Sequence, residues 1–169
     1  MEIIKWILSI LVVIVSAALG LNKSKKFVER EYILSESITL FKRLQNEIVY
    51  LLSPLPNAIE SARINLNTQF KDVVGSIGLS ILQGDFNLNS VEMELSALFQ
   101  LTQYDRQIIA SGLVSLGMSD VSSQVGIIAN TIELLEAQKN DAREEKVKNS
   151  KLYKTIGLIS GVMIAIIFI

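Results

Sequence analysis

The sequence predicts an all-α protein in which a cytoplasmic six-helix bundle domain lies between two terminal transmembrane helices. Both ends of the 169-residue chain are apolar, the middle holds only two prolines, and its apolar residues recur three and four apart. Half of the residues are apolar and the mean hydropathy is +0.41, which fits a small helical domain joined to membrane segments. We therefore expect an N-terminal anchor (1–22), a helical bundle domain (23–138), a polar helical stalk (139–151) and a C-terminal transmembrane helix (152–169).

The C-terminal run, residues 152–169, carries no charged side chain after Lys154. A helix can satisfy its own backbone hydrogen bonds in lipid, although the 15 uncharged residues fall short of the roughly 20 that a span usually needs. Lys151 and Lys154 can extend along the bilayer edge, beside Tyr153 as an interfacial aromatic residue. The alternative is a buried helix of a soluble domain, which is less favoured because the run has no polar face.

The N-terminal run, residues 3–21, is interrupted early by Lys5 and holds Trp6 near its start. It is either an uncleaved anchor or a signal peptide cleaved near Ser16. The weakly charged start favours the anchor. The two spans would pack through small residues that recur every fourth position and let helix backbones approach closely, namely Ser16 and Gly20 in the first and Gly157, Gly161 and Ala165 in the second.

Charge is distributed unevenly along the chain, although the net charge is only −1. Residues 31–138 hold five basic and twelve acidic side chains, whereas residues 139–154 hold six basic and three acidic ones. Residues 22–30 are also basic. Because positive charge stays on the cytoplasmic side, the bundle is predicted to be cytoplasmic, with both chain ends outside. A dedicated lipid-binding role for these basic segments is the less favoured alternative.

The first bundle helix is predicted from Ser24 to Leu52. Its apolar stripe consists of Leu34, Ile38, Phe41, Leu44, Ile48 and Leu51. Pro54 ends this helix, because the residue before a proline avoids the helical region, and Pro56 can occupy the first turn of a second helix to about Phe70. A third helix runs from about Asp72 to Leu82 and is closed by residues 83–85.

Two capping signals precede the fourth and fifth helices. Asn89 and Glu92 have the spacing of a capping box, which predicts a helix from there to about Gln100. Thr102 and Asp105 have the same spacing, which predicts a fifth helix that stops at Gly117. Asp120 would cap the sixth helix. The predicted apolar face of this sixth helix consists of Val121, Val125, Ile128, Ile132 and Leu135. Residues 138–151 are then either a helical stalk or a hinge, and their content of Lys, Glu, Ala and Arg favours the stalk.

The sequence offers little for catalysis. It has no cysteine and no histidine, and neither a Gly-rich phosphate loop nor a GxSxG motif occurs. The acidic bundle also lacks a basic patch for nucleic acid. We therefore expect no enzyme activity, catalytic residue, metal site or cofactor. Polar residues within the apolar stripes, such as Glu47, Tyr50 and Gln124, either fix the bundle by hydrogen bonds or contact a partner.

Two segments resemble a known family when they are taken together. One is Glu47-Ile48-Val49-Tyr50 followed by residues 53–58 (SPLPNA), and the other is residues 116–120 (LGMSD) followed by Gln124. In this order, with an apolar run at each end, they resemble stage III sporulation protein AB of endospore-forming bacteria. The resemblance suggests a set of partner-binding residues: Glu47, Tyr50, Pro54, Pro56, Gly117, Asp120 and Gln124.

The resemblance also implies a function. Such proteins belong to a secretion-like channel complex between mother cell and forespore, and their domain is similar to the cytoplasmic domains of the inner-membrane platform protein of type II secretion. It implies a location in the mother-cell membrane around the forespore and contacts with the lipid bilayer, a cytoplasmic ATPase and other channel subunits. Homo-oligomerisation stays open. The alternative is a membrane sensor whose helical bundle faces outside and binds a ligand.

Overall fold

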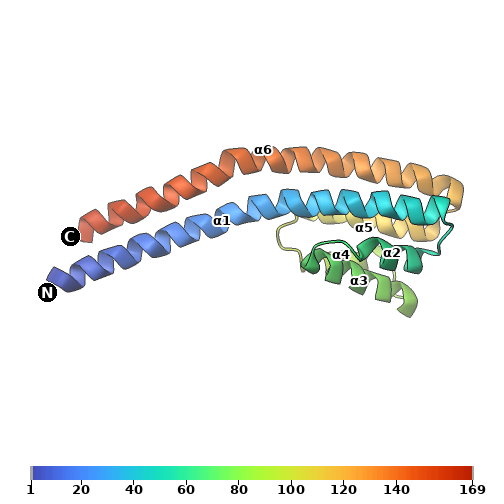
Figure 1. The fold of residues 1–169 in the computed structure, drawn as a ribbon, viewed down its shortest axis with the longest axis horizontal. Coiled ribbons are helices and arrows are strands. Elements are labelled where there is room, and N and C mark those ends of the chain that lie inside the picture. Colours follow the sequence, from blue (N-terminus) through green and yellow to red (C-terminus); the bar gives the residue numbers. More distant parts are fainter. Residues whose placement is uncertain (1, 169) are drawn as a thin grey trace. The chain divides into compact units, whose positions relative to one another are not determined.

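The computed structural model describes the backbone of residues 2–168 as a series of helices (Figure 1). Side chains are described except those of residues 1–13, 16–17, 19–23, 121–122, 150, 154, 157–158, 161–162 and 164–169. The elements are α1 (Glu2–Gln45), the π-helical turn η1 (Asn46–Tyr50), α2 (Leu55–Arg63), α3 (Thr68–Gln83), α4 (Leu88–Leu95), α5 (Gln103–Met118) and α6 (Val121–Phe168). Over this range no strand occurs, and the predicted all-α class is confirmed.

The chain forms two compact units. Unit 1 contains residues 1–31 and 141–169, and unit 2 contains residues 32–140. Helix α6 runs from Val121 to Phe168 and includes residues 139–151. The domain boundaries proposed from the sequence stay a prediction.

Unit 1 consists of two helical segments joined by specific contacts. The ring of Phe27 stacks on that of Tyr153, with centroids 5.8 Å apart and planes 17° apart. Arg30 donates to Glu145, and Lys146 donates to Glu31, each at 2.7 Å. These contacts fix how the α1 and α6 segments of this unit pair.

None of the helices in the described part of the chain is both long enough and apolar enough to cross a membrane. The five small residues predicted to pack the two spans, Ser16, Gly20, Gly157, Gly161 and Ala165, lie outside the residues whose side chains are described.

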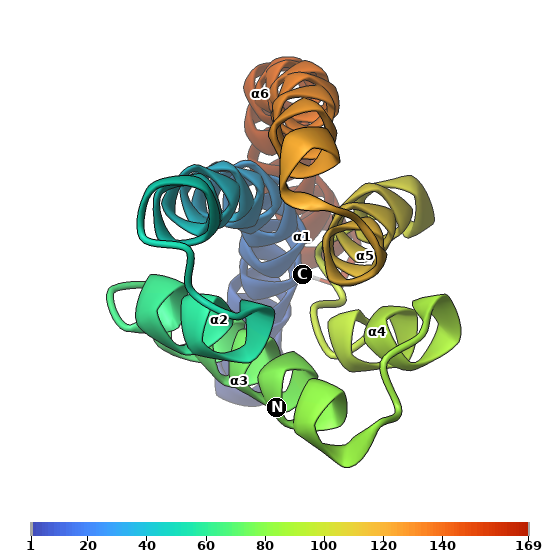
Figure 2. The same cartoon turned by 90° about the vertical axis from the view of Figure 1, so that its right-hand side faces the viewer.

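Unit 2 is a helical bundle around one apolar core. In the end-on view of Figure 2, the unit 2 segments of α1 and α6 and helix α5 lie above α2, α3 and α4. Predicted stripe residues Leu34, Ile38, Phe41, Leu44 and Ile48 are buried. Leu51 and Val125 were predicted to be in the core but are exposed, because Leu51 follows the π-helical turn and Val125 lies on the outer side of α6.

Local chemistry sets most helix ends. Pro56 lies in the first turn of α2, and Gly84, with a left-handed φ of 77°, closes α3, both as predicted. The Thr102–Asp105 capping box of α5 is also confirmed, with reciprocal hydrogen bonds of 3.1 and 2.8 Å. These three short-range patterns therefore mark the ends of their helices.

Several predicted boundaries are wrong, at the α2–α3 junction and at both ends of α4. Phe70 belongs to α3 rather than α2, because Asn67 caps α3 by accepting from the N–H of Gln69. The capping box of α4 is Asn87 with Ser90 instead of Asn89 with Glu92, and this helix ends at Leu95 rather than near Gln100. At the start of both α3 and α4, an asparagine side chain captures the first free backbone N–H groups of the helix.

Candidate partner-binding site

Three connections lie at one end of unit 2: α1–α2, α3–α4 and α5–α6 (Figure 2). They meet at Gly117. A Cβ atom placed there would come within 2.8 Å of the Phe86 ring and 3.3 Å of Leu55 Cδ2. The α1–α2 segment with Leu55 and the α5–α6 segment with Gly117 are the two motifs that carry the family resemblance. The fold therefore brings both motifs together, with Phe86 between them.

Gly117 has a different role from the one predicted. It lies inside α5, which continues to Met118, and it is not the left-handed residue that ends the helix. The absence of a side chain is needed for space, because Phe86 and Leu55 occupy the position of a Cβ. The end of α5 is instead set by Ser119, whose extended backbone breaks the helix and whose hydroxyl donates to the Ser115 carbonyl.

Glu47 stabilises the α1–α2 connection by hydrogen bonds. Its carboxylate accepts hydrogen bonds from the hydroxyls of Ser53, at 3.0 Å, and Ser61. Its carbonyl accepts from the N–H of Ser53 at 2.9 Å. Pro54, in an extended conformation, then leads into α2, where Pro56 fits the first turn. The conformation of the α1–α2 connection is thus set by Glu47, Pro54 and Pro56. The exposed surface of this connection is formed by neighbouring residues.

Gln124 and Asp120 link α5 to α6. The buried Gln124 amide donates to the carbonyls of Leu116, at 3.0 Å, and Ser119, at 3.4 Å. The Asp120 carbonyl accepts from the N–H groups of Ser123 and Gln124, each at 3.1 Å, which places Asp120 just before α6 as predicted. Gln124 therefore holds the interhelix corner in place.

Four exposed apolar side chains surround these connections, and we call them the end face: Tyr50, Leu51, Leu52 and Met118. Leu52 is 70% exposed and Met118 is 84% exposed. Leu52 also has a φ of 53°, and among the described residues no other non-glycine has a positive φ. Such a backbone costs a non-glycine residue roughly 1–2 kcal/mol. A leucine at this position is therefore favoured neither by the stability of the fold nor by the hydration of its exposed side chain.

The connections that carry the end face are acidic. Residues 46–54, 84–87 and 117–120 hold Glu47, Asp85 and Asp120 and no basic residue. An apolar surface with an acidic edge is complementary to an apolar surface with a basic edge. It is not complementary to an anionic lipid surface.

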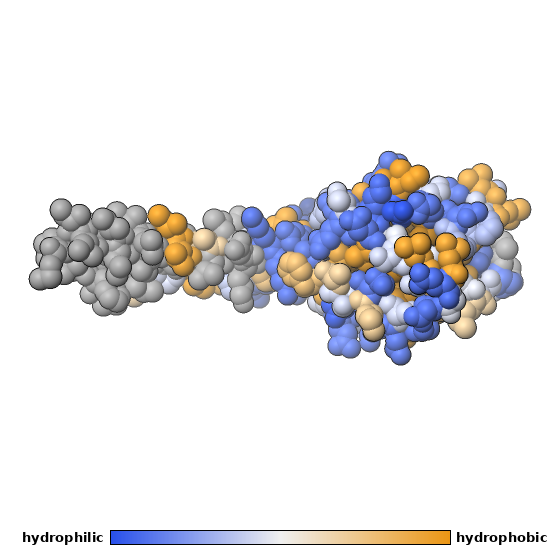
Figure 3. Space-filling model, turned by 90° about the horizontal axis from the view of Figure 1, so that it is seen from below, coloured by the Kyte–Doolittle hydropathy of each residue, from blue (hydrophilic) through white to orange (hydrophobic). Residues whose placement is uncertain are grey.

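A groove of about 480 Å³ between α2 and α3 begins at the same end of unit 2. Pro56 of the first α2 turn and Leu82 of the last α3 turn line it, together with the exposed Leu79. Figure 3 shows hydrophobic side chains among hydrophilic ones on this side of the molecule. The groove lies beside the end face, and its lining also includes the polar residues Asn57, Glu60, Arg63, Asp72 and Ser76.

A salt bridge forms one wall of this groove. Arg63 donates twice to Glu60, at 2.6 and 2.7 Å, and its guanidinium group lies over Gly75. The hydrogen bond from Arg63 lowers the pKa of Glu60, and the same bond raises the pKa of Arg63. The charges of Glu60 and Arg63 offset each other, and Asp72 adds a further carboxylate to the lining of the groove.

Sequence reasoning missed Leu52, Met118 and Phe86. A leucine that follows a helical stripe is expected to be buried, and no sequence pattern indicates its left-handed backbone. Phe86 lies in a short connection where no periodicity applies. Of the predicted residues, Tyr50 alone is a strongly exposed apolar contact, at 73%.

Comparisons with known proteins agree with the resemblance. The family model of stage III sporulation protein AB matches residues 5–169. Stage III sporulation protein AB of Bacillus subtilis (strain 168) is 21% identical over 168 residues, which cover 97% of this chain and 98% of that protein. No solved structure matches the chain. Because the family model covers nearly the whole sequence, the chain belongs to the stage III sporulation protein AB family.

Proposed function

We propose that this chain is a non-enzymatic, membrane-anchored platform subunit of a secretion-like channel complex between mother cell and forespore. In this proposal its end face docks a cytoplasmic ATPase, and its terminal segments contact the bilayer and other membrane subunits. The sporulation role follows from the family, whereas the platform role is our inference from the helical bundle and its apolar end.

Leu52 carries the docking proposal. Its strained backbone and exposed side chain together disfavour leucine on stability grounds, so a contact outside the chain is the physical reason for keeping it. Leu51, Tyr50 and Met118 enlarge the same apolar surface, and exposed aromatic and methionine side chains are enriched at protein interfaces.

The docking experiment measures binding of the full chain, in detergent, to the purified sporulation ATPase of the same host. Leu52→Gly removes the side chain and relieves the backbone, so it is expected to weaken binding by about tenfold without loss of stability. Met93→Ala is the matched control, since Met93 is equally exposed but lies on α4. Equal binding of wild type and Leu52→Gly would contradict the end face, and no binding by wild type would contradict the partner.

The proposed membrane location rests on the apolar terminal runs, residues 3–21 and 152–169. We expect the chain to remain with the membrane fraction after an alkaline carbonate wash. The chain has no cysteine, so Met93→Cys introduces a single exposed thiol. When the chain is expressed in the plasma membrane of vegetative cells, an impermeant maleimide added to whole cells should leave this thiol unlabelled, because unit 2 is proposed to be cytoplasmic. Labelling would favour the sensor alternative.

A further inference from the structure

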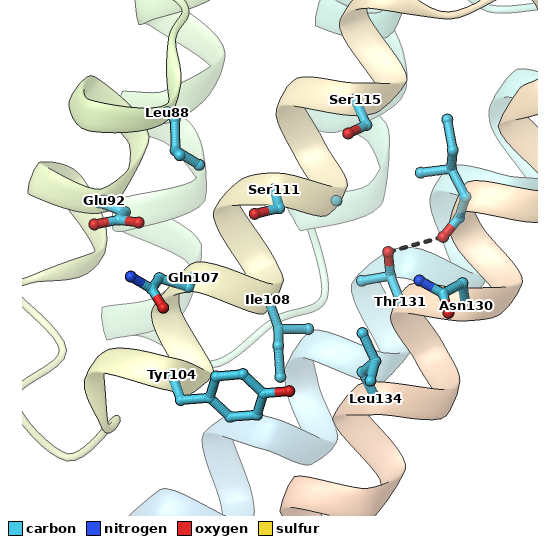
Figure 4. Close-up of a pocket in the computed structure, with 12 residues that line it drawn as sticks. Leu88, Glu92, Tyr104, Gln107, Ile108, Ser111, Ser115, Asn130, Thr131 and Leu134 are labelled. Carbon is cyan, nitrogen blue, oxygen red and sulfur yellow. Dashed lines mark hydrogen bonds between the residues drawn. The ribbon is translucent and has the colours of Figure 1, made fainter.

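A trough of about 420 Å³ runs along the outer side of α5, and the end face does not include it. Figure 4 shows Leu88 and Glu92 reaching it from α4, and Asn130 and Leu134 from α6, with α5 between them. We call it the α5 trough and define it by Leu88, Glu92, Tyr104, Ser111, Ser115 and Leu134.

The floor of the trough is made of small side chains. Ser111 and Ser115 are four residues apart on α5 and therefore lie on one face of the helix. Helix axes approach to about 8–10 Å, the shorter distance where the contacting side chains are small. The exposed Leu88, Tyr104 and Leu134 provide apolar contacts at the walls. This shape fits one helix laid along α5.

Glu92 gives the trough its charge. It is the one charged residue that lines the trough, it is half-buried, and its carboxylate forms no salt bridge with any side chain that the structure describes. A partly desolvated carboxylate is stabilised by an opposite charge, and a Lys or Arg from a partner would supply it. The other polar groups at the trough are neutral hydroxyls and amides.

We infer that the α5 trough binds a helix of a partner protein, which sets its small side chains against Ser111 and Ser115 and a Lys or Arg against Glu92. This inference uses residues other than those of the end face. A partner can therefore occupy the trough whether or not the ATPase docks on Leu52.

The first test counts heat-resistant spores in the native host carrying single substitutions in the full chain. Glu92→Lys places like charges in contact and Ser111→Leu fills the space for the partner helix, and each is expected to lower the count at least about tenfold. Glu94→Lys and Ala137→Leu are the controls, since neither residue lines the trough. Thermal unfolding of each purified chain by circular dichroism checks that the fold is kept.

The second test selects spores that regain heat resistance from the Glu92→Lys strain. The expected suppressors replace a Lys or Arg by Glu or Asp in a helix of a different protein. Suppressors confined to this chain would overturn the inference, because they indicate an internal contact or a second copy of the chain in the trough. Normal spore counts for both Glu92→Lys and Ser111→Leu would also overturn it, as would a loss seen only where the melting temperature falls.

Discussion

Gln124 of α6 donates its amide N–H to the carbonyl of Leu116 in the last turn of α5, at 3.0 Å. The final carbonyls of a helix have no partner within the helix. A glutamine from the next helix therefore completes α5 and fixes the corner that presents Met118 at the end face.

Gln124→Met tests this link, because methionine keeps the length of the side chain and removes the donors. We expect the free energy of unfolding to fall by about 1–2 kcal/mol, since the buried carbonyl of Leu116 and the half-buried carbonyl of Ser119 lose a donor. Gln83→Met, at the exposed end of α3, should change it by less than about 0.5 kcal/mol. Equal stability of the two variants in urea unfolding would contradict the capping role of Gln124.

A pair of glycine-to-alanine substitutions tests the packing of unit 2. A Cβ at Gly112 would lie 2.8 Å from Thr131 and 2.9 Å from Phe41, so Gly112→Ala should destabilise the protein by about 1–3 kcal/mol. Nothing lies within 4 Å of a Cβ at Gly126, also in a helix. Gly126→Ala should therefore raise stability by up to about 1 kcal/mol. A melting temperature of Gly112→Ala that equals or exceeds that of the wild type would contradict the close packing of α5 against α6.

The strain at Leu52 predicts opposite effects at two neighbouring residues. Leu52→Gly removes a left-handed backbone penalty and should stabilise the chain by about 1 kcal/mol. Leu51 has an ordinary right-handed φ of −95°, so Leu51→Gly should instead cost about 0.5–1 kcal/mol. Chemical denaturation of both variants measures the difference, and a loss of stability in Leu52→Gly would refute the strain.

The Glu60–Arg63 pair predicts an acid-side effect. Its hydrogen bond lowers the pKa of Glu60 in the folded chain relative to the unfolded chain. The pair therefore contributes stability above the unfolded pKa, and this contribution disappears as the pH falls through the folded pKa. Because Glu60 is on the surface, we expect a small effect that salt weakens. Carboxyl NMR titration should show the Glu60 pKa rising toward its ordinary value in Arg63→Gln, and an unchanged pKa would contradict the pairing.

Arg30 and Glu145 supply a test within unit 1. The Arg30 side chain is 7% exposed and that of Glu145 is 48% exposed, so solvent screens only one partner. A double-mutant cycle with Arg30→Met and Glu145→Gln should give a coupling of about 0.5–1.5 kcal/mol. The exposed pair Lys42–Glu136, at 3.9 Å, should give close to zero and serves as the control.

Local signals were enough to predict much of the fold. The Thr102–Asp105 box, the proline pair and Gly84 each act within one helical turn, and the structure confirms them. The errors arise where two local choices compete. Asn87 and Asn89 can both cap a helix, and the contacts of Asp85 with Asn87 and Ser90 select Asn87.

The candidate site was harder to predict, because its key features depend on contacts between distant segments. Glu47 and Gln124 were singled out as polar residues in apolar stripes, and both turn out to hold connections in place. The π-helical turn at Asn46–Tyr50 redirects the residues that follow it, so the predicted stripe ends at Ile48 and Leu51 and Leu52 become exposed. A strict helical period cannot indicate such a turn.

The geometry at position 52 offers a way to sort relatives by sequence alone. A glycine at this position would fit the left-handed backbone without penalty and an asparagine at a small one, but neither would offer a large apolar side chain to a partner. Lineages in which the end face still docks a partner should retain a bulky aliphatic residue at position 52, despite the backbone strain that it causes. Lineages that lost this association should acquire glycine or asparagine at position 52. Such a substitution would then indicate from sequence alone that the association was lost.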